Sequence, residues 1–422
     1  MIPTITLNDL CDPRRGITYG IVKVGTFIAD GVPVVRGGDI RNGRISFDNS
    51  KRVSHEISEQ FRRTILRGGE ILVNLIGEAG HSAVVPGSLA GSNVSRDVAV
   101  IAIGERGDAR FVDYCLKSPQ AISWLHSRLQ GSVTQKINLS TLKALPIPSL
   151  PLNEQKAIAS VLGALDDKVA LNRQISATLD VMARALFKSW FVDFDPVRAK
   201  TMGHDTGLPP EIAALFPDSL TDGCAHPFPA GWSMRGLDDV ASFLNGLALQ
   251  KFPPIYGAPN LPVIKISQLR AGHSIGADRA AADLRPDYVV TNGDILFSWS
   301  GSLECNIWTG GPGALNQHLF KVRGREVPDW FAYLAVREHL PEFRQIATDK
   351  ATTMGHIQRH HLHDAKVAVP SERLLQAATS MIGTTFEASW KSRLECVTLT
   401  ALRDALLPKL ISGEVRVKTR DA

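Results

Sequence analysis

Histidines close to residue 360 form the pattern in this chain that comes nearest to a metal site. At helical spacing, His356 and His360 would share one face and offer the imidazole nitrogens that Zn²⁺ prefers. The matching segment of the first half, 135–138, has no histidine, and a site with a shared function would not be missing from one half. We therefore interpret the segment as a polar binding loop, with zinc as the alternative. The histidines concerned are His318, His356, His360, His361 and His363.

Residues for catalysis are not grouped in any motif. Ser82, Ser95 and Cys305 lack the neighbouring base and orienting acid that activate a nucleophile. The sequence has no G-x-x-x-x-G-K-[ST] loop for nucleotide phosphates and no G-x-G-x-x-G turn that opens a helix. The Asn/Asp-Pro-Pro-Tyr/Phe tetrapeptide of DNA amino-methyltransferases is also missing, because 208–211 reads Leu-Pro-Pro-Glu. We expect a chain that is not an enzyme and binds neither a cofactor nor a metal.

Cations crowd the first part of the chain with few acids among them. The formal net charge of +5 decides little by itself, but a basic stripe attracts phosphates and releases counterions from nucleic acid. A solvated surface is the alternative. The stripe consists of Arg14, Arg15, Arg36, Arg41, Arg44, Lys51, Arg52, Arg62, Arg63 and Arg67.

Three pairs of polar segments occupy matching places in the two halves and differ in side chains. They are 36–41 with 265–270, 92–96 with 315–318, and 132–136 with 352–356. Arg and Lys typically read guanine, and Asn and Gln adenine, in the major groove of double-stranded DNA, although most such residues contact phosphate instead. The candidate DNA-binding residues are Arg36, Arg41, Arg44, Asn93, Arg96, Thr134, Gln135, Lys136, Lys265, Gln268, Arg270, Asn316, Gln317, His318, His356 and Arg359.

These segments belong to a unit that the sequence contains twice. Leu7 and Gly16 match Leu237 and Gly246 at an offset of about 230 residues, and the offset falls gradually to about 220 for Ile137 with Ile357. Chance matches would not keep to one slowly drifting diagonal. The period is longer than the ~20 to 50 residues of solenoid and propeller repeats, so we expect a duplicated domain pair.

Each unit begins with a mixed α+β globule. Short apolar runs separated by Gly pairs and Asn-Gly predict strands, and apolar residues at helical spacing predict one helix after them. The predicted strands are 33–35, 70–73 and 98–101, then 261–266, 294–299 and 319–322; the predicted helices are 111–129 and 330–346.

Each unit ends in a long helix, about 153–191 and 371–411. The first would be nearly 60 Å long at ~1.5 Å per residue, too long for one globule to cover. We expect the two apolar stripes to pack together, antiparallel if a two-fold axis relates the halves; packing on the own domain or on a partner is the alternative. Val161 accompanies the stripe, Leu162 and Val169 widen it, and Asn172 interrupts it. The packing residues are Ile158, Leu165, Ile175, Leu179, Met182, Leu186, Met381, Phe386, Leu399, Leu402, Leu406 and Leu410.

Composition fits a soluble protein of two or three domains. The 422 residues are 44% hydrophobic and 21% charged, and no apolar run approaches the ~18 to 20 residues of a membrane span. The N-terminus has no basic leader, so we expect a cytoplasmic protein without a membrane partner. Five widely spaced cysteines suggest reduced thiols.

The middle of the chain resembles one family. The segments 188–200 (KSWFVDFDPVRAK), 215–220 (LFPDSL) and 229–232 (PAGW) resemble the central region of type I restriction-modification specificity subunits. The segment 152–159 (LNEQKAIA) resembles the start of the family's first conserved helix, and 405–414 (ALLPKLISGE) its C-terminal end. With the repeat, the likeness extends over nearly the whole chain.

The resemblance implies two target-recognition domains separated by a long antiparallel two-helix coiled coil, each domain reading half of a bipartite, asymmetric DNA site. It implies modification subunits that carry S-adenosylmethionine and methylate adenine, and restriction subunits that use ATP and Mg²⁺ to cleave. The domains expected are 1–152 and 232–370 for recognition, 153–192 and 371–412 for the spacer helices, 193–231 for a linker and 413–422 for a tail.

Alternative functions stay open at this point. A helical protein-protein scaffold would bind no DNA, and a specificity module of a related restriction-modification-like system would differ in its partners. An enzyme that fuses recognition with cleavage would need motifs that the sequence lacks.

Overall fold

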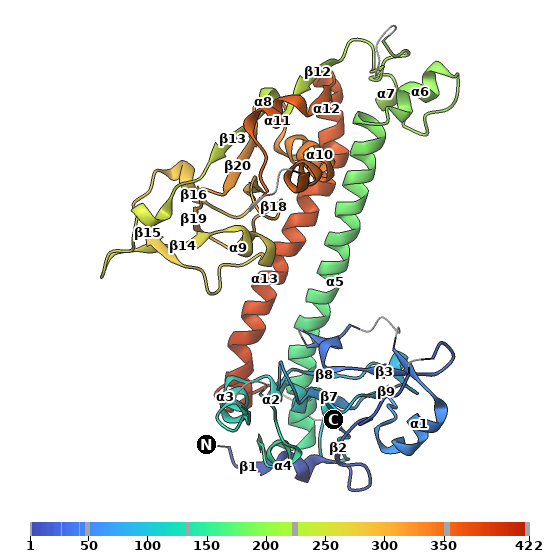
Figure 1. Ribbon diagram of the computed structural model, residues 1–422, viewed down its shortest axis with the longest axis vertical. Helices are drawn as coiled ribbons and strands as arrows, with labels where there is room; N and C mark the ends of the chain where they lie inside the picture. The colour runs from blue at the N-terminus through green and yellow to red at the C-terminus, as the bar shows by residue number, and fades with distance from the viewer. Residues whose placement is uncertain are drawn as a thin grey trace. The chain divides into compact units, whose positions relative to one another are not determined.

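The computed structural model describes residues 2–26, 28–41, 43–46, 51–131, 135–221, 227–349 and 355–417. The chain divides into two compact units (Figure 1): unit 1 is Met1–Asp167 with Leu399–Ala422, and unit 2 is Lys168–Thr398. Each unit has a globular part and a segment of both long helices, α5 (Leu152–Phe191) and α13 (Thr384–Ile411). Within the described residues, no helix combines the length and apolar character that a membrane crossing requires.

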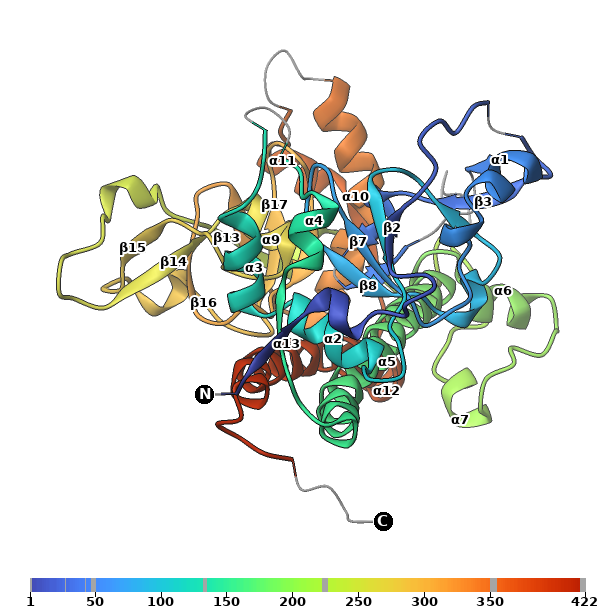
Figure 2. The same ribbon diagram turned by 90° about the horizontal axis from the view of Figure 1, so that it is seen from below.

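Unit 1 contains a four-stranded antiparallel sheet in the order β2-β10-β7-β8, a three-stranded sheet β6-β3-β9 and the pair β1-β11. Figure 2 labels β2, β7 and β8 of the first sheet and β3 of the second. Strands β3 and β9 are parallel, while the other pairs are antiparallel. The strands are β1 (Thr4–Thr6), β2 (Ile17–Tyr19), β3 (Val32–Val35), β4 (Ile40–Arg41), β5 (Arg44–Ile45), β6 (Arg52–Val53), β7 (Ile71–Asn74), β8 (Ser82–Val84), β9 (Asn93–Val94), β10 (Val98–Ile101) and β11 (Pro146–Pro148).

Unit 2 repeats this topology within the described residues, except that its second sheet has a fourth strand and unit 1 has an additional pair, β4-β5. Its sheets run β13-β20-β17-β18, β15-β14-β19-β16 and β12-β21, again with one parallel pair, β14 with β19. The strands are β12 (Ser233–Gly236), β13 (Ala241–Asn245), β14 (Asn260–Ile264), β15 (Arg279–Ala281), β16 (Val289–Val290), β17 (Ile295–Ser298), β18 (Cys305–Ile307), β19 (Gly313–Leu315), β20 (Leu319–Gly324) and β21 (Lys366–Val369). The predicted α+β class and internal repeat are confirmed.

Shorter helices complete both units. The helix predicted at 111–129 is divided in two, because Ser118 accepts a hydrogen bond from Ala121 N and Pro119, without an N–H, starts a new helix. The helices are α1 (His55–Gln60), α2 (Ala109–Leu116), α3 (Pro119–His126), α4 (Leu139–Lys143), α6 (Asp195–Thr201), α7 (Pro210–Ala213), α8 (Leu237–Val240), α9 (Ile266–Ala271), α10 (Asp329–Asp349), α11 (Arg359–Asp364) and α12 (Glu372–Ala378). A π-helical turn, Thr379–Gly383, connects α12 to α13.

An aromatic cluster forms the part of the unit 2 core where α5 ends. The rings of Trp190 and Phe216 lie 5.2 Å apart, and that of Trp232 lies 5.9 Å from both Phe191 and Phe194. Phe194 and Phe216 come from the segment 193–231, which we expected to be a linker. Because burying large aromatic side chains is strongly favourable, this segment packs into unit 2 and also forms α6 and α7.

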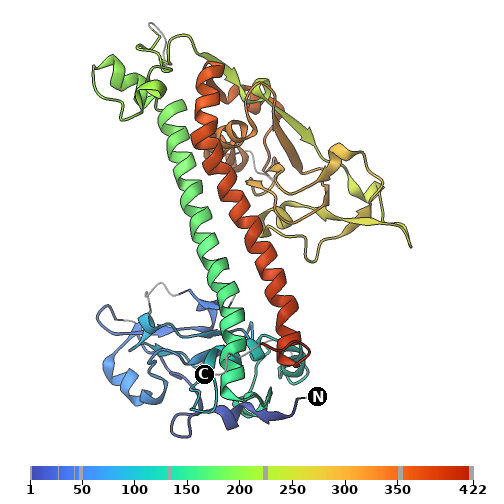
Figure 3. The same cartoon turned by 180° about the vertical axis from the view of Figure 1, so that it is seen from behind.

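Helices α5 and α13 pair antiparallel within each unit (Figure 3). In unit 2, the Asn172 amide donates to Glu395 Oε2 at 2.7 Å, and the Ser176 and Ser389 hydroxyls lie 3.2 Å apart. The residue number rises along α5 as it falls along α13. Ile158 and Leu162 share a core cluster with Leu407 and Leu410 in unit 1.

One of the two heptad positions predicted on α5, that of Ile158, Leu165, Leu179 and Leu186, is confirmed, while its partner position is displaced by one residue. At the displaced position of α5, and at one heptad position of α13, buried residues recur at multiples of seven. They are Leu162, Val169, Ser176, Ala183 and Trp190 on α5, and Ser389, Cys396 and Leu410 on α13.

The exposed fractions of Ile175, Met182 and Leu402 are 37, 49 and 46%. The prediction that these three residues pack between the helices is therefore wrong, and so is that for Val161. Polar Ser176 and small Ala183 on the true face made the neighbouring face look more apolar. The remaining predicted packing residues are buried or partly buried.

Candidate nucleic-acid interface

In unit 2, the loop 299–304 after β17 gathers the three segments that the sequence singled out. The Ser300 hydroxyl lies 2.9 Å from His318 Nδ1, which brings in the segment 315–318. Gly301 N donates to Gly355 O at 2.8 Å, which brings in the residue before His356. An ion pair of Arg270 with Glu304, at 3.6 Å, ties α9 to the same loop. We call the loop 299–304, together with the segments 265–270, 315–318 and 355–356, the unit 2 cluster.

Unit 1 brings the corresponding segments together around the loop 75–80. Gly77 N donates to Gln135 O at 3.2 Å, and Leu75 N to Asp97 O at 2.7 Å. The Asp97 carboxylate also accepts a hydrogen bond from Gly37 N at 2.9 Å, which ties in the segment 36–41. We call the loop 75–80, together with the segments 36–41, 92–97 and 135–136, the unit 1 cluster.

Backbone hydrogen bonds define which residues correspond in the two clusters. Arg96 N donates to Ile21 O at 3.0 Å, and Gln317 N to Leu247 O at 2.9 Å. Isolated bridges pair Lys136 with Ile76 and His356 with Ser300 in the same way. Arg96 therefore corresponds to Gln317 and Lys136 to His356.

The same bonds set the register of the matched segments 92–96 and 315–318 and correct one equivalence drawn from the sequence. Ser95 corresponds to Asn316, since each donates its N–H to the preceding parallel strand. Gly20, not Gly16, corresponds to Gly246. A Cβ at Gly20 or Gly246 would lie 2.0 or 2.2 Å from a carbonyl oxygen of the neighbouring segment, so only glycine fits.

Two candidate DNA-binding residues are buried and hold the clusters together instead. The Asn93 amide donates to Ser58 Oγ at 3.0 Å, and its oxygen accepts a hydrogen bond from Thr64 at 2.7 Å. Asn316 accepts a hydrogen bond from His318 N. Neither is available to a base, since buried polar groups that are already paired offer no contact.

Other candidates lie at the surface. Gln268 is partly buried and accepts a hydrogen bond from Lys265 N at the start of α9, and Thr134 lies outside the described residues. Gln317, His318 and Arg36 are partly exposed. The exposed candidates are Arg41, Arg44, Arg96, Gln135, Lys136, Lys265, Arg270, His356 and Arg359.

The two clusters differ in chemistry. In unit 2 the Trp299 indole donates to Asn245 Oδ1 at 3.0 Å, and the His318 ring lies 5.8 Å from the indole. Unit 1 has Leu75 and Asp97 in place of Trp299 and His318. The sequence analysis missed Asn245, the last residue of β13, and Trp299, which directly follows β17, because both adjoin apolar strands. A side chain that can form hydrogen bonds at the end of a strand is a usable signal.

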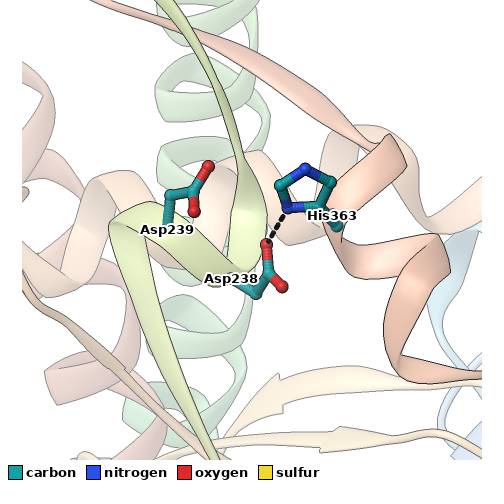
Figure 4. A group of neighbouring side chains, drawn as sticks. All are labelled: Asp238, Asp239 and His363. Atoms are coloured by element: carbon teal, nitrogen blue, oxygen red, sulfur yellow. Dashed lines mark hydrogen bonds and ion pairs between the residues drawn. The ribbon is translucent and has the colours of Figure 1, made fainter.

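The histidines do not form one metal site. His356 precedes α11 and lies beside Ser300, while the His360 and His361 rings are 4.0 Å apart, so the predicted shared helical face is wrong. A group of three potential ligands among the described residues is Asp238, Asp239 and His363 (Figure 4).

These three side chains already have structural roles. Asp239 accepts a hydrogen bond from Gly236 N at 2.9 Å, as Asp9 does from Thr6 N in unit 1, and His363 Nδ1 lies 3.2 Å from Asp238. Asp9 has the same capping role in unit 1, and within the part of the chain that the structure describes no histidine is bonded to it. Capping therefore accounts for the position of Asp239 without a metal.

The candidate nucleophiles are engaged as well. Burial raises the pKa of Cys305 to about 12, so its thiol stays protonated. Ser82 donates to Asp113 at 2.6 Å in the core, and Ser95 to Asp97.

The matching family model and the similar proteins are all described as type I restriction specificity domains or subunits. Residues 4–180 match the model of the type I restriction modification DNA specificity domain. The chain is similar to the type I restriction enzyme MjaIX specificity subunit of Methanocaldococcus jannaschii, with 24% identity over 98% of this chain and 93% of that one. It is 26% identical to the HindI specificity subunit of Haemophilus influenzae over 64% of this chain and 70% of that one.

A solved structure shows the same fold. The S subunit of the type I restriction-modification system from M. genitalium aligns with a TM-score of 0.58 and 17% identity, over 100% of this chain and 97% of that one.

Proposed function

The chain belongs to the specificity subunits of type I restriction-modification systems, and on this premise we propose that each unit binds one half of a bipartite, asymmetric site in double-stranded DNA. The unit 1 cluster reads one half-site and the unit 2 cluster the other. Together they determine where the assembled complex acts, in the cytoplasm.

One observation carries the proposal: the two clusters share a backbone frame and differ in side chains. Gly77 N donates to Gln135 O as Gly301 N donates to Gly355 O, yet Arg96 stands where unit 2 has Gln317. A common frame places both surfaces against DNA in the same manner, while different donors and acceptors select different bases.

The long helices are the second part of the proposal. On the segment of α5 in unit 2, Leu171, Ile175 and Met182 are exposed at spacings of one and two helical turns, away from the α13 seam. This apolar stripe supports docking of a modification subunit on α5. The paired helices also fix the spacing of the two half-sites.

Chemistry belongs to the partners in this proposal. The chain binds no cofactor and catalyses no step. S-adenosylmethionine serves the modification subunits, and ATP with Mg²⁺ the restriction subunits. The engaged states of Cys305, Ser82 and Asp239 support this division.

The test is to purify the chain with its cognate modification subunit and to map methylated adenines on genomic DNA. The expected result is one motif with two defined halves and a fixed gap. A helical scaffold without DNA contact predicts no motif and no salt dependence, whereas several phosphate contacts predict an affinity that falls by orders of magnitude between low and moderate salt. Methylation without a two-part motif contradicts the proposal.

A further inference from the structure

We propose that Arg96 and Gln317 read the bases that make the two half-sites different, Arg96 a guanine and Gln317 an adenine. This inference rests on the proposed function and assigns the discriminating contact within it. It treats the two residues as one position of the repeated frame with two chemistries.

The first step is that both side chains leave the backbone from the same place. Hydrogen bonds hold each residue through its N–H, Arg96 to Ile21 O and Gln317 to Leu247 O. The preceding residues are fixed as well. Ser95 N donates to Val35 O at 2.9 Å, and its counterpart Asn316 donates its N–H to the equivalent strand of unit 2. A side chain on a fixed backbone meets the same groove position in both half-sites, because the geometry is set before binding.

The second step compares this position with the others that correspond. Arg36 is matched by Lys265, since each donates its N–H to the side chain three residues on, and Lys136 is matched by His356. A basic type retained in both units suits phosphate, which is the same along all DNA. At Arg96 and Gln317 the cation is replaced by a neutral amide, and this change suits a base edge.

The third step is that both groups are available. Arg96 is exposed, and within the described part of the chain no hydrogen bond or ion pair holds its guanidinium. The adjacent Asp97 carboxylate is occupied by Gly37 N and the Ser95 hydroxyl. The guanidinium can therefore present two parallel N–H groups, the geometry that matches guanine O6 and N7.

The Gln317 amide is oriented by its neighbours. Its Nε2 lies 3.4 Å from His318 Nε2, while the other ring nitrogen of His318 bonds to Ser300. Its backbone oxygen accepts a hydrogen bond from the Trp299 indole at 3.1 Å. This leaves the amide oxygen and one N–H, the donor and acceptor pair that adenine N6 and N7 require.

The experiment starts from the motif that the wild-type complex with its modification subunit methylates. Variants Arg96→Ala and Gln317→Ala are then mapped in the same complex. We expect Arg96→Ala to lose preference at one guanine of one half-site by about tenfold or more, and Gln317→Ala at one adenine of the other, with the gap unchanged. Arg96→Gln should move preference toward adenine, and Gln317→Arg toward guanine.

Lys136→Ala is the matched control, since a phosphate contact should weaken all sites equally. If a variant methylates too little to map, competition with duplexes that carry single base changes gives the same readout. Uniform weakening across duplexes in Arg96→Ala or Gln317→Ala, or a change at the wrong base, overturns the inference while the two-part motif stands. A wild-type complex with no two-part motif overturns the proposed function itself.

Discussion

The Arg403 guanidinium on α13 lies 2.6 Å from the Asp166 carboxylate on α5, within unit 1. The other oxygen of that carboxylate accepts a hydrogen bond from the Tyr114 hydroxyl on α2, also at 2.6 Å. Burial raises the pKa of Tyr114, and the bond to Asp166 adds to this, so the phenol keeps its proton. Asp166 thus joins both long helices to the globular part of unit 1.

Replacing these residues should destabilise unit 1 in a fixed order. Tyr114→Phe removes one neutral donor and should lower the free energy of unfolding by about 1 kcal/mol; Asp166→Asn removes the charged acceptor of two bonds and should cost about 2 kcal/mol. Urea unfolding measures both. Arg110→Gln is the control, because its pair with Asp167 is exposed at 3.9 Å and should contribute nothing measurable. Equal losses in all three variants would contradict this role of Asp166.

A buried carboxylate in the sheet of unit 2 gives the second prediction. The Asp294 side chain is fully buried and pairs with Lys321 at 3.0 Å and with Arg323. Asp294→Asn leaves the mostly buried Lys321 without its counter-charge and should cost about 3 kcal/mol. Thermal unfolding checks this against Glu326→Gln, which removes an exposed partner of Arg235 and should leave the midpoint unchanged. A small loss in Asp294→Asn would mean that water reaches Lys321.

Sequence patterns predicted the regular elements well because local patterning decides them. The run at 98–101 is buried at every position and forms β10, and the apolar residues after Pro328 form α10. The repeat was readable because the same strands and turns recur in the same order.

The errors arose where tertiary contacts decide. Nothing local distinguishes Asn93, which is buried against Ser58 and Thr64, from an exposed base reader. The true seam includes Ser176 and Ala183, whose burial depends on the partner helix. The gathering of three distant segments around Ser300 likewise follows from sheet topology, which no single segment encodes.

The thiol of Cys305 predicts how stability depends on pH. Burial raises its pKa from the ordinary 9.0 to about 12. Between these values the unfolded chain loses the proton and the folded chain keeps it, so the contribution of Cys305 is complete below about pH 9 and is lost as pH rises toward 12.

Cys305→Ala should therefore be less stable than wild type at pH 8, and the difference should narrow between pH 9 and 11. Urea midpoints across this range measure it, and other alkaline groups cancel because both proteins carry them. Ile307→Ala, also buried on β18, is the control for a cavity without a thiol, and its deficit should not narrow. A constant deficit in Cys305→Ala would mean that the thiol ionises in the folded chain.

The proposed spacing role of the helices can be tested by lengthening both at once. Seven residues inserted in α5 between Asn172 and Ser176, and seven in α13 between Ser389 and Cys396, keep the seam facing inward, since the seam repeats every seven residues. The helices lengthen by ~10.5 Å at ~1.5 Å per residue. At ~3.4 Å per base pair, the preferred gap should grow by up to about three base pairs while both half-sites stay the same.

Insertion in α5 alone is the control for this experiment. It shifts Asn172 and Ser176 out of register with their partners on α13, and it should lower stability and methylation together. Methylation mapping of the doubly lengthened complex then distinguishes a gap set by the helices from a gap set within the units. If that complex is folded and active but keeps the wild-type gap, the spacing is set within the units and not by the helices, because no other part of the chain changed in length.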